Sequence, residues 1–173
     1  MKLFKFRYRI ASVIIFAGLA CSHIEAQETP AADVSFGYSG IAIPKGASFR
    51  VYGGSSSVAL NVNHWLGGVG DFGFYHASPF GPGLAAGTYT FGPRFSYRHG
   101  GRFTLFAQAL FGGLRYAANG LAFGSGGGAD IGLDSGGRFA LRPQVEYFGF
   151  RANGITTNTI RVSFGIVFRI GKK

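Results

Sequence analysis

Charged side chains are scarce in this sequence. Asp, Glu, Lys and Arg together make up 14% of its 173 residues, whereas a soluble domain carries about 25% and needs them to cover its surface. Acidic residues are the scarcest, with seven Asp and Glu against 17 Lys and Arg, which gives a formal net charge of +10. Because 47% of the residues are hydrophobic, much apolar surface must face something other than water.

Cysteine and long apolar runs are also nearly absent. The single cysteine, Cys21, excludes a disulfide within the chain. After residue 30, no stretch approaches the roughly 18 consecutive apolar residues of a transmembrane helix, and none sustains the helical spacing of apolar residues. Glycine (30 residues) and aromatic residues (16%) are abundant instead, and so many aromatics exclude a disordered chain.

The positive charge does not indicate a nucleic-acid-binding protein. Four of the basic residues stand within the first nine positions, at Lys2, Lys5, Arg7 and Arg9. The others are scattered singly through apolar sequence, without the basic cluster or recognition helix that such proteins use. We therefore expect no nucleic-acid partner.

The first 26 residues have the pattern of a secretory signal peptide. A basic segment, residues 1–9, precedes an apolar run over residues 10–20, which is too short to span a bilayer as a helix. Cleavage after Ala26 would leave Gln27 as the mature N-terminus. We therefore expect residues 1–26 to be a signal peptide and residues 27–173 to be a single domain.

Cys21 leaves a second cleavage site open. Gly18-Leu19-Ala20-Cys21 ends like the lipobox of a lipoprotein, although Gly18 stands where leucine is usual. Cleavage there would leave Cys21 lipidated, whereas cleavage after Ala26 would leave a mature protein without cysteine.

Period-two alternation of apolar and polar residues recurs after residue 30, which predicts β-strands. Gly100-Gly101-Arg102-Phe103 recurs 36 residues later as Gly136-Gly137-Arg138-Phe139, and each copy lies between alternating runs, as a hairpin turn does. Two strands in every 36 residues give about eight strands. We place them at residues 32–40, 54–62, 66–76, 88–97, 103–115, 121–133, 139–151 and 157–170.

The predicted connections alternate in length. Those near residues 63, 100 and 136 are short, and those over residues 41–53 and 77–87 are long and rich in Gly and Pro. Most of the predicted strands are long enough to cross a bilayer at a tilt. Long strands with short turns at one end and long loops at the other are typical of outer-membrane barrels, in which the short turns are periplasmic.

Pairing the strands about Gly136 separates an apolar face from a charged one. The apolar face then pairs Leu133 with Phe139, Ile131 with Leu141, and Gly127 with Val145. The other face pairs Asp130 with Arg142 and Gly126 with Glu146. In residues 157–170, the even positions from Ile160 to Ile170 are apolar, and the odd ones include Arg161, Ser163, Gly165 and Arg169.

Pairing about Gly100 gives the same partition. One face pairs Tyr97 with Phe103, Phe95 with Leu105, Phe91 with Ala109, and Tyr89 with Phe111. The other pairs Ser96 with Thr104 and Gly92 with Gln108, and it also carries Arg94.

The apolar face is expected to face lipid. A soluble lipocalin-like barrel would turn it inward and leave Gly, Ser, Thr and isolated charges to meet water, which is a poor soluble surface. Aromatic residues near strand ends also suit interfacial girdles: Trp65, Tyr89, Tyr97, Phe103, Phe139 and Tyr147. The predicted fold class is all-β: a transmembrane antiparallel up-and-down β-barrel of about eight strands. In its narrow lumen we expect an ion-pair network of Asp71, Arg94, Asp130, Arg142 and Glu146.

The sequence resembles the small outer-membrane β-barrel proteins of the eight-stranded OmpA/OmpX-like class. The resemblance covers most of residues 32–170 and rests on residues 70–72, 91–98, 126–130, 141–147 and 161–169. It implies the outer membrane of a Gram-negative bacterium, contact with outer-membrane lipids and lipopolysaccharide, and biogenesis through the Sec translocon and the barrel-assembly machinery. Two features differ: Phe168 is not the terminal residue, and no peptidoglycan-binding domain follows.

Enzymatic and cofactor sites are weakly supported. Gly124-Ser125-Gly126-Gly127-Gly128-Ala129 matches a dinucleotide fingerprint in letters only, because the residues that follow alternate as a strand and not as a helix. His64, His76 and His99 lack the spacing of metal ligands. We therefore expect no enzyme, cofactor or metal.

The expected function is that of a non-enzymatic integral outer-membrane protein in envelope structure or surface interaction, with an unknown surface ligand left open. Three alternatives remain: a surface adhesin acting through residues 41–53 and 77–87, a narrow channel, and a rim-sited lipid A hydrolase using His76 and Ser78.

Overall fold

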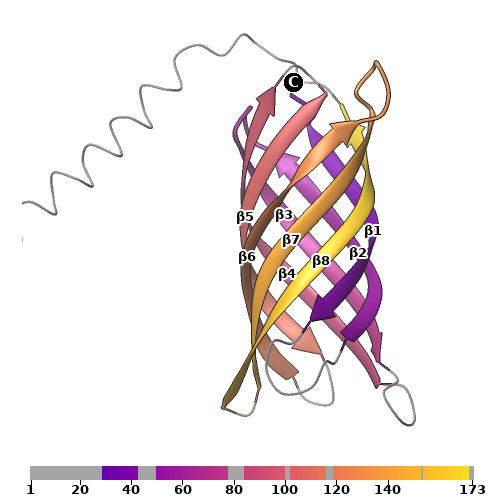
Figure 1. Ribbon diagram of the computed structural model, residues 1–173. Coiled ribbons are helices and arrows are strands. Elements are labelled where there is room, and N and C mark those ends of the chain that lie inside the picture. Colours follow the sequence, from indigo (N-terminus) through magenta and orange to yellow (C-terminus); the bar gives the residue numbers. More distant parts are fainter. Residues whose placement is uncertain are drawn as a thin grey trace, which may run out of the picture.

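The computed structural model is a closed antiparallel barrel of eight strands in sequential order (Figure 1). It describes residues 29–42, 50–77, 84–99, 102–115, 119–152 and 154–171. The strands are β1 (Ala32–Ala42), β2 (Arg50–Asn61), β3 (Leu66–Ala77), β4 (Leu84–His99), β5 (Phe103–Arg115), β6 (Asn119–Gly132), β7 (Phe139–Ala152) and β8 (Ile155–Ile170). In these ranges, no helix is long and apolar enough to cross a membrane. The expected signal peptide, with Cys21, Ala26 and Gln27, lies outside the described residues.

The strands are steeply staggered around the barrel. Each residue can be followed to its paired residue on the next strand, once around the barrel. Starting at Asn61 of β2 and passing through β3 to β8 and then β1, this path returns to β2 at Val51, ten residues from the start. Such a stagger tilts the strands against the axis, as Figure 1 shows. β1 pairs with β8 and closes the barrel. Since the strand number is even, the described residues nearest to both chain termini lie at the same end, which we call the termini end.

The predicted number of strands is confirmed, and the predicted loops are too long. β2 begins at Arg50 and β4 at Leu84, so much of the expected 41–53 and 77–87 loops is strand. One of the glycines that indicated a loop, Gly53, lies in the sheet where two backbones come close together. A Cβ on Gly53 would lie 1.9 Å from the carbonyl oxygen of Phe74. The earlier start of β4 also places Tyr89 five residues inside its strand.

The register predicted about Gly136 is confirmed, since Ile131 pairs with Leu141 and Gly126 with Glu146. The register predicted about Gly100 is wrong by two residues. Tyr97 pairs with Leu105 and not with Phe103, which pairs with His99 instead. The other pairs change likewise: Phe95–Ala107, Phe91–Phe111, Tyr89–Gly113, Ser96–Phe106 and Arg94–Gln108.

The two hairpins differ although both contain Gly-Gly-Arg-Phe. In the second, the Asp134 carboxylate accepts hydrogen bonds from the backbone N–H groups of Arg138 (3.1 Å) and Phe139 (2.8 Å) and so holds a wide turn. Before the first copy stand Arg98 and His99, which supply no such carboxylate. The turn there tightens by two residues, and a shift of two leaves every side chain on its predicted face.

The barrel is apolar outside and polar inside. Among the residues that the structure describes, the buried side chains are those of twenty polar or charged residues and ten hydrophobic ones, the reverse of a soluble core. Every strand carries an exposed large hydrophobic residue: Phe36, Leu60, Phe74, Phe91, Phe111, Leu121, Val145 and Phe164. This partition confirms the predicted faces and fits a barrel surrounded by lipid.

Exposed aromatic residues mark both ends of the wall. At the termini end lie Trp65, Tyr97, Phe103 and Phe139, as predicted. At the other end, Tyr38 stacks on Tyr52 with ring centroids 6.0 Å apart. Tyr147 lies five residues inside β7, so it does not mark a strand end.

Candidate functional site: the luminal charge network

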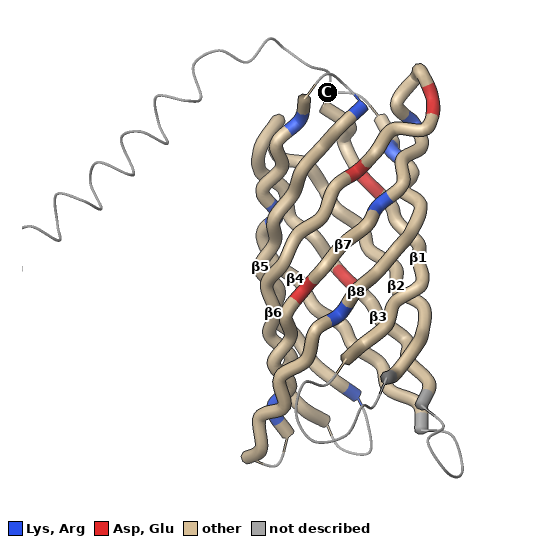
Figure 2. Tube along the Cα trace, in the orientation of Figure 1, with Lys and Arg blue, Asp and Glu red and all other residues tan. Residues whose placement is uncertain are grey.

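Three arginines and three carboxylates meet inside the barrel. Figure 2 shows acidic and basic positions side by side at two levels along its axis. All six side chains are at most 3% exposed; they are Asp71, Arg94, Asp130, Arg142, Glu146 and Arg161. Equal numbers of each sign leave these six residues without net charge. A fourth buried carboxylate, Asp33 of β1, accepts a hydrogen bond from Asn61 Nδ2 (3.2 Å).

The first level is a bidentate ion pair. Arg142 donates from Nε to Asp130 Oδ1 (2.6 Å) and from Nη2 to Asp130 Oδ2 (2.8 Å). Planar fork geometry of this kind gives the strongest Arg–carboxylate contacts. Arg169 lies 3.8 Å from Asp130 Oδ2 as a second, weaker cation.

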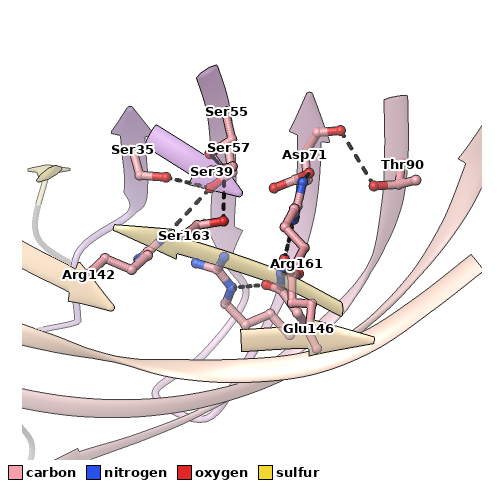
Figure 3. A network of polar contacts seen from close by, with 12 residues as sticks. Ser35, Ser39, Ser55, Ser57, Asp71, Thr90, Arg142, Glu146, Arg161 and Ser163 are labelled. Atoms are coloured by element: carbon pink, nitrogen blue, oxygen red, sulfur yellow. Dashed lines mark hydrogen bonds and ion pairs between the residues drawn. The ribbon is translucent and has the colours of Figure 1, made fainter. Parts of the chain in front are cut away.

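The second level is centred on Arg161 of β8 (Figure 3). Its Nε donates to Glu146 Oε2 (2.6 Å), and its Nη2 also contacts this oxygen. Across the lumen, Nη1 donates to Asp71 Oδ1 (2.7 Å) and to the hydroxyl of Tyr75 (3.1 Å). The guanidinium therefore joins opposite walls of the barrel, since Glu146 is on β7 and Asp71 on β3.

A line of polar contacts follows one row of paired residues around the wall. Arg94 Nε donates to Gln108 Oε1 (2.9 Å), and Gln108 Nε2 donates to Glu146 Oε1 (2.7 Å). Between Gln108 and Glu146 the row passes through Gly126 of β6. A Cβ there would lie 2.6 Å from Glu146 Cγ, so glycine leaves the space through which glutamine reaches across a strand.

Aromatic rings fill the space between the charges. The guanidinium carbon of Arg94 lies 4.4 Å from the ring centroid of Phe106, and that of Arg142 lies 4.8 Å from it. Arg161 covers Phe148 at 4.7 Å. Cation–π contacts of this kind stabilise desolvated guanidinium groups. They do so for Arg94 above all, whose two Nη atoms have no hydrogen-bond partner among the described residues.

Serine hydroxyls form a second polar region on β1, β2 and β8 (Figure 3). Ser39 bonds Ser55 (2.7 Å) and Ser163 (2.8 Å), and Ser35 bonds Ser57 (2.7 Å). A cavity of about 20 Å³ lies beside them, with Asp71 and Arg142 also in its lining. A polar cavity of this volume holds about one water molecule, so side chains close the lumen here.

The five residues expected in the lumen lie there together, but the two arginines among them differ in their contacts. Only Arg142 pairs directly with a carboxylate. Asp130 pairs with Arg142, Arg94 reaches Glu146 only through Gln108, and Asp71 pairs with a different arginine. The alternation over residues 157–170 predicted Arg161 on the inner face, but Arg161 was not among the residues expected in the network. Pairing β7 with β8 sets Glu146 directly opposite Arg161, and that hairpin register was the missing signal.

The residues considered for metal binding or hydrolysis do not form one cluster. Among the residues that the structure describes, no three His, Cys, Asp or Glu side chains are placed to hold a metal ion. His64 and His99 lie at the termini end and His76 at the opposite end of β3. Ser78, named with His76 as a hydrolase candidate, lies outside the described residues. Residues 124–128 form part of strand β6, so the match to a dinucleotide fingerprint is incidental.

No family model matches the sequence, and no curated protein matches it. Solved structures match the fold. Neisserial surface protein A is 12% identical, with a TM-score of 0.57 over 80% of this chain and 96% of that one. Ail, the attachment invasion locus protein of Yersinia pestis, is 15% identical, with a TM-score of 0.52 over 79% and 97%. The N-terminal β-barrel domain of Pseudomonas aeruginosa OprF is 11% identical, with a TM-score of 0.51 over 82% and 100%.

The fold is that of the small outer-membrane β-barrels. Identities this low establish the architecture alone, because one fold carries many functions.

Proposed function

We propose that this chain is a non-enzymatic integral outer-membrane protein whose closed barrel serves envelope structure or surface interaction. The supporting observation is the inverted partition of side chains. Large hydrophobic residues are exposed on all eight strands, while three arginines and four carboxylates of the described residues are buried inside. Such a wall is stable only in contact with lipid, and a lumen filled by paired side chains leaves little room for a substrate or an ion path.

The proposal includes the route to the membrane. Residues 1–26 act as a signal peptide for the Sec translocon, cleaved between Ala26 and Gln27, and the barrel-assembly machinery inserts the rest. The termini end then faces the periplasm, as in other outer-membrane barrels. The opposite end faces outward into lipopolysaccharide, in a Gram-negative envelope.

Cell fractionation tests this proposal. The protein should appear in the outer-membrane fraction, shortened at its N-terminus by 26 residues. Its gel mobility should change on boiling, because a closed barrel resists SDS until heated. Recovery as a soluble periplasmic protein without a mobility change would refute it. N-terminal sequencing separates cleavage before Gln27 from cleavage before Cys21.

A second candidate function is attachment to an anionic surface ligand. The chain segments at the outward end, residues 38–53, 74–89, 113–123 and 147–158, contain no Asp or Glu. Arg115 and Arg151 are exposed there on either side of β6, paired with Asn119 and Leu121. Among the structural neighbours, Ail has been solved in complex with the heparin analogue sucrose octasulfate. Within the expected loops at 41–53 and 77–87, residues 43–49 and 78–83 lie outside the described residues.

Titration with sucrose octasulfate tests the second candidate. Saturable binding that Arg115→Gln with Arg151→Gln abolishes, and that Arg102→Gln at the opposite end leaves unchanged, would support it. No binding, or equal loss in both variants, would contradict it.

A further inference from the structure

A groove of about 490 Å³ runs along the outer wall where β8 closes onto β1. β7, β8 and β1 lie side by side here (Figure 1), and the groove is at the termini end. Val34, Phe36, Phe139 and Phe168 line it, and Arg138 stands beside it in the turn before β7. Its wall is almost wholly apolar apart from arginine.

The hollow follows from one small residue in a row of large ones. Phe139 pairs with Phe168, and Phe168 pairs with Val34, so these three outward residues stand side by side on β7, β8 and β1. The two rings meet edge to face with centroids 4.8 Å apart. Phe36 follows as the next outward residue of β1 and is 60% exposed. Valine is too short to fill the space between these rings, so a groove remains that a flexible hydrocarbon chain fits.

Arg138 brings an uncommitted positive charge to the groove. Its side chain is exposed, and among the described residues its guanidinium has no hydrogen-bond or ion-pair partner. Asp134, the nearest acid in sequence, directs its carboxylate to backbone N–H groups of the turn. The other arginine of the groove, Arg169, is already engaged by Gly137 O (3.4 Å), Thr104 Oγ1 (3.3 Å) and Asp130 (3.8 Å).

We propose that this groove binds one anionic glycerophospholipid, with an acyl chain along Val34 and Phe168 and the phosphate on Arg138. The inference rests on the proposed function, which places the wall in lipid and this end at the periplasmic leaflet. A guanidinium binds a phosphate by paired charged hydrogen bonds. A zwitterionic headgroup brings an ammonium toward Arg138 and Arg169, the two arginines that line the groove, so a net anionic headgroup is favoured.

The repeated Gly-Gly-Arg-Phe sequence supplies a matched control. Arg102 precedes Phe103 in the first hairpin as Arg138 precedes Phe139 in the second, and both arginines are exposed. Only the second pair lines this groove. Arg102→Gln therefore removes the same charge at the same end of the barrel and leaves the groove intact.

The experiment is native mass spectrometry of the protein purified from outer membranes and titrated in detergent with phosphatidylglycerol or phosphatidylethanolamine. One phosphatidylglycerol should bind saturably. Arg138→Gln should weaken it by about tenfold or more, as loss of hydrogen bonds to a charged group does. Arg102→Gln should not weaken it. Val34→Phe, which fills the groove, should reduce binding of both lipids.

Equal binding of the two lipids, or equal losses from Arg138→Gln and Arg102→Gln, would overturn the inference. Boiling-dependent gel mobility, measured on the same samples, reports the barrel separately. If it is retained while lipid selectivity is missing, only this inference fails. If the unmodified protein shows no such mobility change, the proposed function fails as well.

Discussion

At the scale of single residues, the arginines of the lumen differ in the number of carboxylates with which each forms an ion pair. Arg142 forms an ion pair with Asp130, which also has Arg169 nearby. Arg161 forms ion pairs with both Asp71 and Glu146. The buried pairs must overcome the desolvation of their charges, so their chief effect is to specify how the walls meet and to close the lumen.

Arg161→Ala should therefore destabilise the barrel more than Arg142→Ala. The first change strands two buried carboxylates, and removing one partner of a buried pair costs about 3–5 kcal/mol. The second leaves Asp130 with Arg169. Urea unfolding in lipid vesicles measures both free energies. Equal costs, or a larger cost for Arg142→Ala, would contradict the assignment.

The double change of Asp130 and Arg142 to Ala should cost less than the sum of the two single changes.

Gly126→Ala should destabilise the barrel because β6 and β7 approach too closely for a side chain. The new Cβ would lie 2.3 Å from the carbonyl oxygen of Val145 and 2.5 Å from Glu146 Cα. Overpacking of this kind costs about 1–3 kcal/mol. Gly68→Ala is the control, since nothing lies within 4 Å of a Cβ there; we expect a change under about 0.5 kcal/mol. Similar unfolding curves for the two variants would refute the packing argument.

At the scale of strands and turns, sequence periodicity predicted the eight strands and their faces because a narrow barrel with lipid outside repeats the same alternation on every strand. The register of the hairpin at Gly136 could be predicted, because opposite charges had to pair on one face while apolar residues paired on the other. The register of the β4–β5 hairpin could not be predicted, because a two-residue shift keeps every side chain on the same face. Strand ends at 50–53 and 84–87 were missed, since glycine indicates both turns and close strand contact.

The β6–β7 turn should loosen in acid through Asp134. Its pKa is held below the usual value, first by the hydrogen bond from the Phe139 N–H and then by that from Arg138. A lowered folded-state pKa means that this contribution is complete above the unfolded pKa of about 3.9 and is lost as the pH falls through the folded value. Hydrogen-exchange protection of the Phe139 amide should fall below about pH 4. In Asp134→Ala the protection should be low throughout; an unchanged profile would contradict this role.

At the scale of the whole molecule, the barrel combines an apolar wall, a lumen closed by paired charged side chains and an outward end without acids. Contacts across the lumen between distant strands, such as that of Arg161 with Asp71, could not be predicted from the sequence. Pairing residues about a turn relates only the two strands of one hairpin, and β8 and β3 do not form a hairpin. Only the closed stagger of the barrel brings these residues together. Inside the closed barrel, the cavity beside the serines is only large enough for about one water molecule, whereas a pore would need a continuous open path.

Purified protein in a planar bilayer should therefore show little or no steady conductance, because side chains fill an eight-stranded interior. Large, stable conductance steps would favour the channel alternative and show that the luminal pairs open.

The claim on which everything else depends is that the apolar face meets lipid and the polar face meets the lumen. Single cysteines with spin labels along β8, in protein reconstituted into vesicles, test it directly. The probe positions are Val162, Phe164, Ile166 and Phe168 outward, with Ser163 and Val167 inward. Oxygen, which concentrates in the bilayer, should collide often with the outward labels and rarely with the inward ones, alternating with a period of two. An opposite phase, or uniform accessibility along the strand, would contradict the account.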